Sequence, residues 1–172
     1  FRFDVASIST LEVGGSHNVQ VRLVVPGVML VEPVSATVVG AGSGNATSGA
    51  DYTAFGSQVV TFPAGSTDGA TQPVNLAVLD DLLLEGDEDV ALQISSSGPG
   101  ASIGTPSDHQ VTIQDNESVQ VVFDVASSSA AEAGGGDPAP LRLVAAAGVM
   151  LAVLVETDVI DAGSGAATSG SD

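Results

Sequence analysis

The chain has 172 residues, of which 3 are basic and 21 are acidic, and its net charge is −18. Such a charge repels nucleic acids and anionic membranes, so the composition excludes both as partners. The longest apolar run, from Leu143 to Val155, is thirteen residues long, which is too short to cross a bilayer as a helix. Cysteine is absent, which excludes disulfides, thiolate metal sites and cysteine nucleophiles.

The first two thirds of the chain consist of short alternating segments separated by turn residues. Val, Ala and Leu dominate a hydrophobic content of 44%, and 21 glycines supply turns, which favours β-structure. The predicted strands are Arg2 to Ser7, Ser9 to Leu11, Asn18 to Val25, Val31 to Val39, Ser57 to Phe62, Thr71 to Leu79, Glu88 to Ser95 and His109 to Gln114. Pro33 indicates an edge or a bulge in its segment. Short strands at this spacing predict an all-β fold, an antiparallel β-sandwich.

Acidic residues crowd the connection between two of these strands. Six of the ten residues from Asp80 to Asp89 are carboxylates, and like charges this close repel one another unless something neutralises them. The chain has no lysine, and its arginines stand far from this turn in the sequence: Arg2, Arg22 and Arg142. Carboxylate oxygens without cysteine select a hard divalent ion, Ca²⁺ ahead of Mg²⁺. A solvated acidic loop is the alternative interpretation.

The sequence repeats itself after about 120 residues. Phe3-Asp4-Val5-Ala6-Ser7 returns at residues 123–127, and Gly27-Val28-Met29-Leu30 returns at residues 148–151 after a one-residue insertion. Ala41 to Asp51 returns as Ala162 to Asp172, and Glu132 to Gly135 repeats Glu12 to Gly15. We therefore predict one complete module, residues 1–120, and the first strands of a second, residues 121–172. Because a few strands cannot bury an apolar face alone, we expect either a longer chain or another chain to complete the second module.

Four motifs in the first module resemble those of the Calx-beta family. Ala46 to Tyr52 is similar to the family's "ATxGxDY" segment, and Val60 to Gly65 resembles its "LTFxxG" strand and turn. The acidic stretch Val78 to Glu88 is similar to "ILDDxxxEGDE", and Gly104 to Glu117 to "LGxPSxxxVTIxDxD". They occur in the family's order across residues 1–117.

This resemblance implies an immunoglobulin-like β-sandwich with calcium bound at one end. Carried over by motif, the expected Ca²⁺ ligands are Glu12, Asp51, Asp80, Asp81, Glu85, Glu88, Asp115 and Glu117. Asn116 stands where the best-equipped members have another Asp, which lowers the charge of the site. Gly86 gives room for the turn between the acids. Asp87 and Asp89 are expected to face outwards into solvent.

Two functions follow from the resemblance. The first is an extracellular or cell-surface protein, structural or adhesive, in which a tandem array is stiffened by calcium and pairs with neighbouring modules of the same or identical chains in a fibre or matrix. The alternative is a calcium-sensing regulatory module of a larger transporter or enzyme. His17 and His109 are interpreted as surface or turn residues without a catalytic partner, so the chain is predicted not to be an enzyme.

Overall fold

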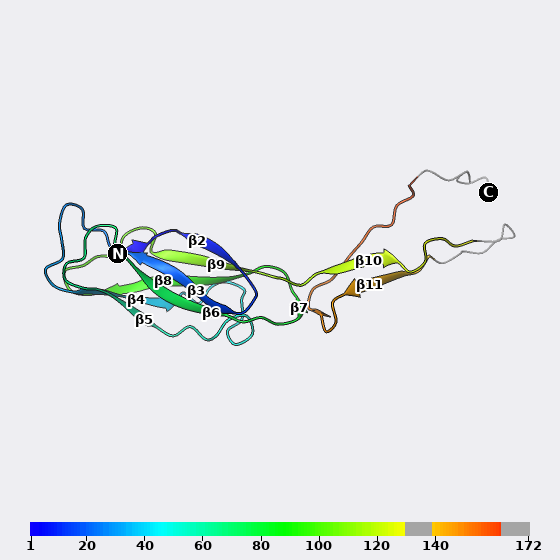
Figure 1. Cartoon of the computed structure of the whole chain (residues 1–172), viewed down its shortest axis with the longest axis horizontal. Helices are drawn as coiled ribbons and strands as arrows, with labels where there is room; N and C mark the ends of the chain where they lie inside the picture. The colour runs from blue at the N-terminus through cyan, green and yellow to red at the C-terminus, as the bar shows by residue number, and fades with distance from the viewer. Residues whose placement is uncertain (130–138, 163–172) are drawn as a thin grey trace.

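Two β-sheets pack face to face in the first module (Figure 1). The computed structural model describes residues 1–129 and 139–162. Its strands are β1 (Arg2–Phe3), β2 (Ser7–Leu11), β3 (Gly15–Arg22), β4 (Val34–Gly40), β5 (Gln58–Phe62), β6 (Thr71–Val78), β7 (Leu83–Leu84), β8 (Glu88–Ser97), β9 (Asp108–Gln114), β10 (Val119–Phe123), β11 (Leu141–Ala145) and β12 (Met150–Leu151). One sheet has the order β1-β3-β6 and the other the order β2-β9-β8-β4-β5.

The core lies between these sheets and follows the alternation of the strands. Phe3, Val21 and Leu76 of the three-stranded sheet are fully buried, and so are Phe62 and Leu92 of the five-stranded sheet. Successive residues of a strand point to opposite faces, so every second residue enters the core. The predicted β-sandwich is confirmed.

The first strand is broken, as predicted, but the chain changes sheets between Phe3 and Ser7 and not at Ile8, where we expected the break. β1 pairs with β3, whereas β2 pairs with β9 in the other sheet. Because the chain crosses without reversing direction, β2 runs parallel to β9, and this pair departs from the antiparallel arrangement that we predicted. β4 begins at Val34, directly after Pro33, so the proline precedes its strand.

His109 belongs to the core, and its interpretation as a surface or turn residue is wrong. The side chain is only 2% exposed and its ring centroid lies 5.2 Å from that of Phe3. Its Nδ1 is 2.8 Å from the carbonyl oxygen of Val5, while the buried Nε2 contacts no hydrogen-bond partner among the described residues. On β9 the inward positions alternate as His109, Val111 and Ile113, and this alternation is the signal that we overlooked.

The ribbon of β10 and β11 reproduces the pairing of β1 and β3. Phe123 pairs with Leu141 as Phe3 pairs with Val21. The ion pair between Arg22 and Asp4 also has a counterpart, since Arg142 Nε lies 2.9 Å from Asp124 Oδ1.

The face that β1 and β3 bury is open in the second module. Phe123 is 53% exposed, whereas Phe3 is completely buried. Residues 155–161, which correspond to β4, form no strand. β4 pairs with β5 and β8, whereas the repeat corresponds only to residues up to 51 of the first module and so includes a counterpart of neither partner. The repeated residues 132–135 and 163–172 lie outside the described residues, and the module boundary at residue 120 stays a prediction.

The second module contacts the acidic turn of the first. β12 pairs in parallel with β7, with Met150 opposite Leu83 and Leu151 opposite Leu84. Figure 1 places β7 between the sandwich and the ribbon. Nowhere in the part of the chain that the structure describes is there a helix with the length and hydrophobicity to cross a membrane.

Candidate metal centre

Segments far apart in the sequence deliver carboxylates to one end of the sandwich. Glu12 directly follows β2, and Asp51 lies in the loop between β4 and β5. Asp81 and Glu85 flank β7, and Glu88 is the first residue of β8. Asp115 and Glu117 lie between β9 and β10. The sheet topology, with β2, β9 and β8 adjacent, brings these positions together.

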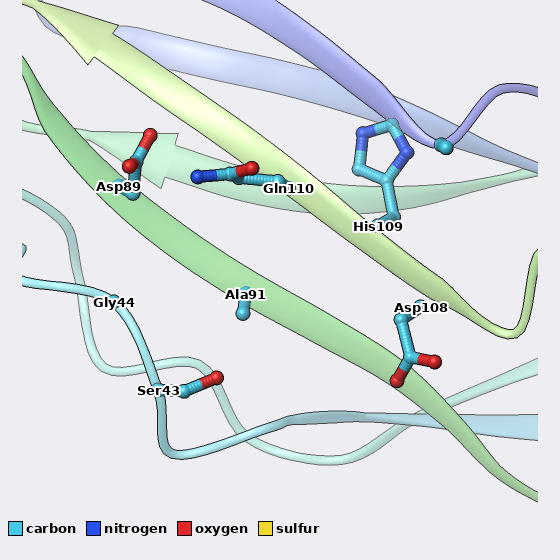
Figure 2. Close-up of a pocket in the computed structure, with 8 residues that line it drawn as sticks. Ser43, Gly44, Asp89, Ala91, Asp108, His109 and Gln110 are labelled. Carbon is cyan, nitrogen blue, oxygen red and sulfur yellow. The ribbon is translucent and has the colours of Figure 1, made fainter.

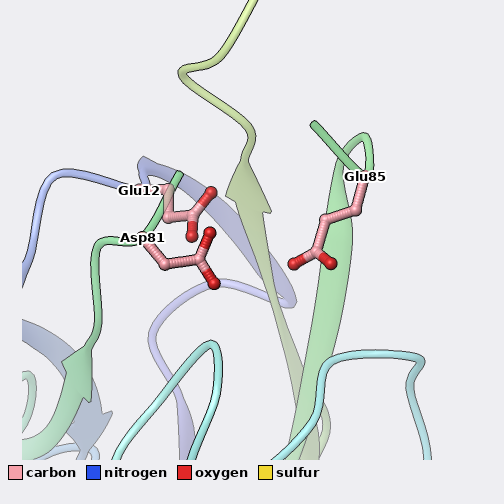
Figure 3. Close-up of side chains that lie close together, drawn as sticks. All are labelled: Glu12, Asp81 and Glu85. Carbon is pink, nitrogen blue, oxygen red and sulfur yellow. The ribbon is translucent and has the colours of Figure 1, made fainter. Parts of the chain in front are cut away.

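The carboxylates form three overlapping groups. Within each group, one oxygen of every member lies within 4.8 Å of one oxygen of every other member. The groups are Glu12 with Asp81 and Glu85, Glu12 with Asp115 and Glu117, and Asp51 with Glu85 and Glu88. Because they share Glu12 and Glu85, they make one continuous set, which we call the acidic cluster. Figure 3 shows the carboxylates of Glu12, Asp81 and Glu85 turned toward a common space.

Glu12 lies at the centre of the acidic cluster and is buried. It is 3% exposed, and its Oε1 contacts no hydrogen-bond partner among the described residues. Burial, followed by the negative charges of Asp81 and Glu117, raises the pKa of Glu12 to about 7. A buried carboxylate oxygen without a partner is costly, because it has lost water and gained nothing in return.

Asp51 is equally buried and is held by its own loop. Its Oδ2 accepts a hydrogen bond from the amide of Thr47, and its amide donates to the carbonyl of Thr47 at 3.0 Å. Burial, and then the neighbouring Asp51, raises the pKa of Glu88 to about 8. Burial together with Asp51 and Asp81 also raises the pKa of Glu85. The fold therefore holds these acids close together although their charges repel one another.

Asp115 differs because backbone amides surround it. Its Oδ2 accepts hydrogen bonds from the amides of Glu85 at 2.9 Å and Gly86 at 2.6 Å, and its Oδ1 accepts one from Glu117 at 2.9 Å. Burial raises its pKa, but these amides outweigh burial and the net pKa lies below the usual value. Burial and the adjacent Asp115 raise the pKa of Glu117. Asp115 thus stays ionised and also fixes the turn that carries Glu85.

Asp80 is the predicted ligand that stands outside the three groups. Its side chain is exposed, and its Oδ1 accepts a hydrogen bond of 2.9 Å from Asn116 Nδ2. The same amide nitrogen donates to the carbonyl oxygen of Glu12 at 2.6 Å. Asn116, which the sequence singled out as a missing Asp, therefore ties Asp80 to the segment that carries Glu12.

No basic side chain of the described residues neutralises the acidic cluster. Arg22 pairs with Asp4, Arg142 pairs with Asp124, and Arg2 donates to the carbonyl oxygens of Phe3 and Asp4 at 3.2 Å. The chain has no lysine. The positive charge that the cluster requires must therefore come from outside these residues.

Asp89 and Asp108, which lie outside the acidic cluster, have protein partners of their own. Asp87 is exposed as expected, but Asp89 is half-buried and accepts a hydrogen bond of 2.8 Å from Thr112 Oγ1. Asp89 and Asp108 line a hollow of about 440 Å³ on the outer face of β8 and β9 (Figure 2). Asp108 accepts hydrogen bonds of 2.9 Å from Gln93 and from Ser107. These two carboxylates are satisfied, so the hollow is a weaker candidate for an ion than the acidic cluster.

The donor set of the acidic cluster suits a hard divalent cation. It consists of carboxylate oxygens, and such oxygens prefer Ca²⁺ or Mg²⁺ to softer metals. Ca²⁺ accepts more ligands and a looser geometry than Mg²⁺, which fits a cluster assembled from several loops. The orphaned oxygen of Glu12 supplies the independent indication that a cation belongs here.

Fold and site together define a class: an immunoglobulin-like β-sandwich with a carboxylate-rich ion site at one end. The family model of the Calx-beta domain matches residues 1–117. The chain belongs to the Calx-beta domain family.

Solved structures of Calx domains have a similar fold. The calcium binding domain CBD12 of CALX1.1 aligns with a TM-score of 0.58 and 23% identity, over 66% of this chain and 43% of that chain. The apo-form Calx CBD1 domain aligns with a TM-score of 0.55 and 22% identity, over 67% of this chain and 96% of that chain. The Calx CBD2 domain follows with a TM-score of 0.53 and 12% identity, over 66% of this chain and 85% of that chain.

These alignments establish the fold. The chain spans less than half the length of the CBD12 structure that it matches. No curated protein matches the chain significantly.

Proposed function

We propose that the chain is a calcium-binding module and that the acidic cluster holds the ion. The observation that carries this proposal is the buried, unpartnered Glu12 oxygen among carboxylates that no basic side chain of the described residues neutralises. The residues that would hold calcium are Glu12, Asp51, Asp81, Glu85, Glu88, Asp115 and Glu117, with Asp80 at the rim. When bound, the ion supplies the positive charge that the carboxylates lack.

The chain's own residues prepare this end of the sandwich for a cation. Backbone amides hold Asp115 and Asp51 in place, so these two carboxylates need little rearrangement. The pKa values of Glu12 and Glu88 are raised to about 7 and about 8, so near neutral pH these two groups lose protons as calcium binds. Binding therefore links the end of β2 to the turns around β7 and to the end of β9.

We favour a regulatory role for the site. In this role calcium binding by the module controls a larger transporter or enzyme. The similar solved structures include one described as the calcium binding domain of CALX1.1. The close approach of β12 to the turn that carries Asp81 and Glu85 supports a signal that passes from the site to the next module.

A structural role in a tandem array is the second candidate. It is supported by the ribbon of β10 and β11, which repeats the pairing and the ion pair of β1 and β3. In this role the protein would stand outside the cell or on its surface and pair with modules of its own kind. The carboxylates of the acidic cluster suit cation binding. In both roles the module therefore binds an ion, and we propose no catalytic reaction for it.

Thermal unfolding with increasing calcium tests the proposal. Calcium at a hundredfold excess over Kd is expected to add roughly 2.7 kcal/mol to the free energy of unfolding. The double variant Asp81→Asn/Glu85→Gln should lose this gain, whereas the control Asp87→Asn, at an exposed position, should keep it. Equal melting temperatures of the wild type with and without calcium would contradict the proposal that this site binds calcium.

A further inference from the structure

The contact between the two modules is made by backbone atoms of one short loop. The amide of Met150 donates to the carbonyl of Leu82 at 2.8 Å, and the amide of Ala152 donates to the carbonyl of Leu84 at 2.9 Å. Next to this pairing, Leu82 lies over Gly148, where an added Cβ would approach its Cδ1 to 3.1 Å. The loop of the second module therefore docks on the acidic turn Asp81 to Glu85 of the first.

The first module carries the same loop. Gly27-Val28-Met29-Leu30 has the sequence of Gly148-Val149-Met150-Leu151. The turn is also the same, since the amide of Val28 donates to Val25 at 3.2 Å and that of Val149 donates to Ala146 at 3.3 Å. Both glycines have positive φ, 75° for Gly27 and 93° for Gly148.

None of the described residues docks on the corresponding loop of the first module. An added Cβ on Gly27 meets no atom within 4 Å, in contrast to Gly148 beneath Leu82. Val28 is 63% exposed and Val31 is 84% exposed. We call this surface, Gly27 to Val31, the docking loop.

One edge of the docking loop is hydrogen-bonded to a neighbouring turn, and its other edge faces away from that turn. Leu30 makes the hydrogen bonds to the neighbouring turn: its amide donates to Ser66 at 2.9 Å, and its carbonyl accepts from Gly65 at 2.7 Å. Because alternate residues of an extended segment present their amides to opposite edges, the amides of Met29 and Val31 face the other edge. Their counterparts are Met150 and Ala152, which donate to the acidic turn in the second module together with the amide of Val153, 3.2 Å from the carbonyl oxygen of Leu84.

We propose that the docking loop is an interaction surface for the acidic turn of another Calx-beta unit joined ahead of it. The partner is a turn of the type Asp-Leu-Leu-Leu-Glu, whose two outer leucines offer backbone carbonyls and whose first leucine covers the glycine. Leu82 to Leu84 show this chemistry within the chain. The contact is short, so it forms between tethered units, where the effective concentration is high.

Site-directed crosslinking tests the proposal in a fusion that places residues 1–120 ahead of the 172-residue chain. This fusion keeps the 120-residue spacing at which Phe3 to Ser7 returns, and the chain has no cysteine of its own. One variant carries Leu83→Cys in the leading copy and Met29→Cys in the following copy. The reference is Leu83→Cys with Met150→Cys in the 172-residue chain, because these residues are paired. The control is Leu83→Cys in the leading copy with Val59→Cys in the following copy, an exposed position on β5.

Mild oxidation should remove both free thiols of the fusion variant to an extent comparable with the reference pair, because register-paired residues lie within disulfide range. The control should keep its thiols. Retention of the thiols by the fusion variant while the reference crosslinks would overturn the proposal. Retention by the reference as well would overturn it too, since the contact from which it is inferred would then not exist. Thermal unfolding of each reduced variant shows whether the sandwich is intact.

Discussion

Glu12 and Glu85 bring carboxylate oxygens within 4.8 Å of each other, although Glu12 follows β2 at the edge of the five-stranded sheet and Glu85 follows β7. Both groups have raised pKa values, and burial is the largest cause in each case. Two acids that repel each other persist at this distance because the strands behind them are fixed by the core. The ion-free site therefore stores unfavourable electrostatic energy that a cation relieves.

Replacing Glu12 by Gln should raise the stability of the ion-free protein and lower its affinity for calcium. The amide keeps the shape of the side chain and removes the buried charge, so we expect the ion-free protein to gain about 1 kcal/mol or more in unfolding free energy at pH 8. Calcium affinity should fall by at least about tenfold, which corresponds to 1.4 kcal/mol. Melting curves in chelator and calorimetric titration with calcium measure the two effects. A Glu12→Gln variant that is less stable without calcium and binds calcium as well as the wild type would contradict both.

The ion-free protein should be more stable at pH 5 than at pH 8. The pKa of Glu12 is about 7 and that of Glu88 about 8 in the folded protein, against 4.5 for an unperturbed Glu. Between these values the folded state binds more protons than the unfolded state, so the free energy of unfolding falls as the pH rises. One such group changes it by about 1.4 kcal/mol per pH unit.

Calcium should counteract the fall in stability with rising pH, because the ion competes with protons for the carboxylates. The gain in melting temperature from saturating calcium is expected to be larger at pH 8 than at pH 5. Melting curves at both pH values, with chelator and with calcium, check the prediction. A higher ion-free melting temperature at pH 8 would show that the raised pKa values of Glu12 and Glu88 do not govern stability.

Local patterns in the sequence were sufficient to predict the sandwich. Alternation predicted the inward positions of β6 and β8, and a broken first strand was expected, although the break falls between Phe3 and Ser7 and not at Ile8. The parallel pairing of β2 with β9 was not predictable, because it depends on the direction in which the chain crosses between sheets. His109 was misplaced because a polar residue at a strand start is most often exposed.

The acidic cluster was predicted in part. Motif order indicated which carboxylates gather, but the distances among them depend on loops that the sequence alone does not position. Asp80 shows this limit: it neighbours Asp81, yet its side chain turns to Asn116 at the surface. The contact of β12 with β7 was also invisible, because backbone pairing between modules leaves no mark on residue type.

Below pH 6.5 the titration of His109 should affect the free energy of unfolding in the opposite direction to the titration of Glu12 and Glu88. Burial lowers its pKa from 6.5, although the hydrogen bond to Val5 acts in the other direction. The unfolded state then binds the proton that the folded state resists, so this residue removes stability as the pH falls below 6.5.

The variant His109→Asn carries no such group. Between pH 6.5 and pH 5 its ion-free unfolding free energy should rise more than that of the wild type, by up to about 2 kcal/mol. Urea unfolding in chelator at both pH values measures the difference of slopes, which is independent of the stability lost to the mutation itself. Identical slopes would mean that His109 is not protonated on unfolding.

Removal of residues 121–172 should leave the first module folded. The core residues are contributed by residues 1–113, and the described part of the second module adds only the short pairing at β7. Three backbone hydrogen bonds join Met150, Ala152 and Val153 to this turn. Since each contributes about 0.5–1.5 kcal/mol, the loss in unfolding free energy should stay below about 4.5 kcal/mol. Cooperative melting of the fragment 1–120 checks this prediction. A fragment that does not melt cooperatively would show that the predicted boundary at residue 120 is wrong.

Calcium should also restrict the second module relative to the first. Asp81 and Glu85 flank the strand that pairs with β12, and Asp115 and Glu117 precede β10, so an ion held by these side chains fixes both attachments of the second module. We expect the 172-residue chain to show a narrower distribution of inter-module distances with calcium than with chelator. Small-angle scattering measures the maximum dimension, and spin labels at Val59→Cys and Val144→Cys, both exposed, measure the distribution. The variant Asp81→Asn/Glu85→Gln serves as the control, because it should resemble the chelated protein at every calcium concentration. A wild-type distribution that is unchanged by calcium under conditions where the first module is stabilised would show that the site does not act on the second module.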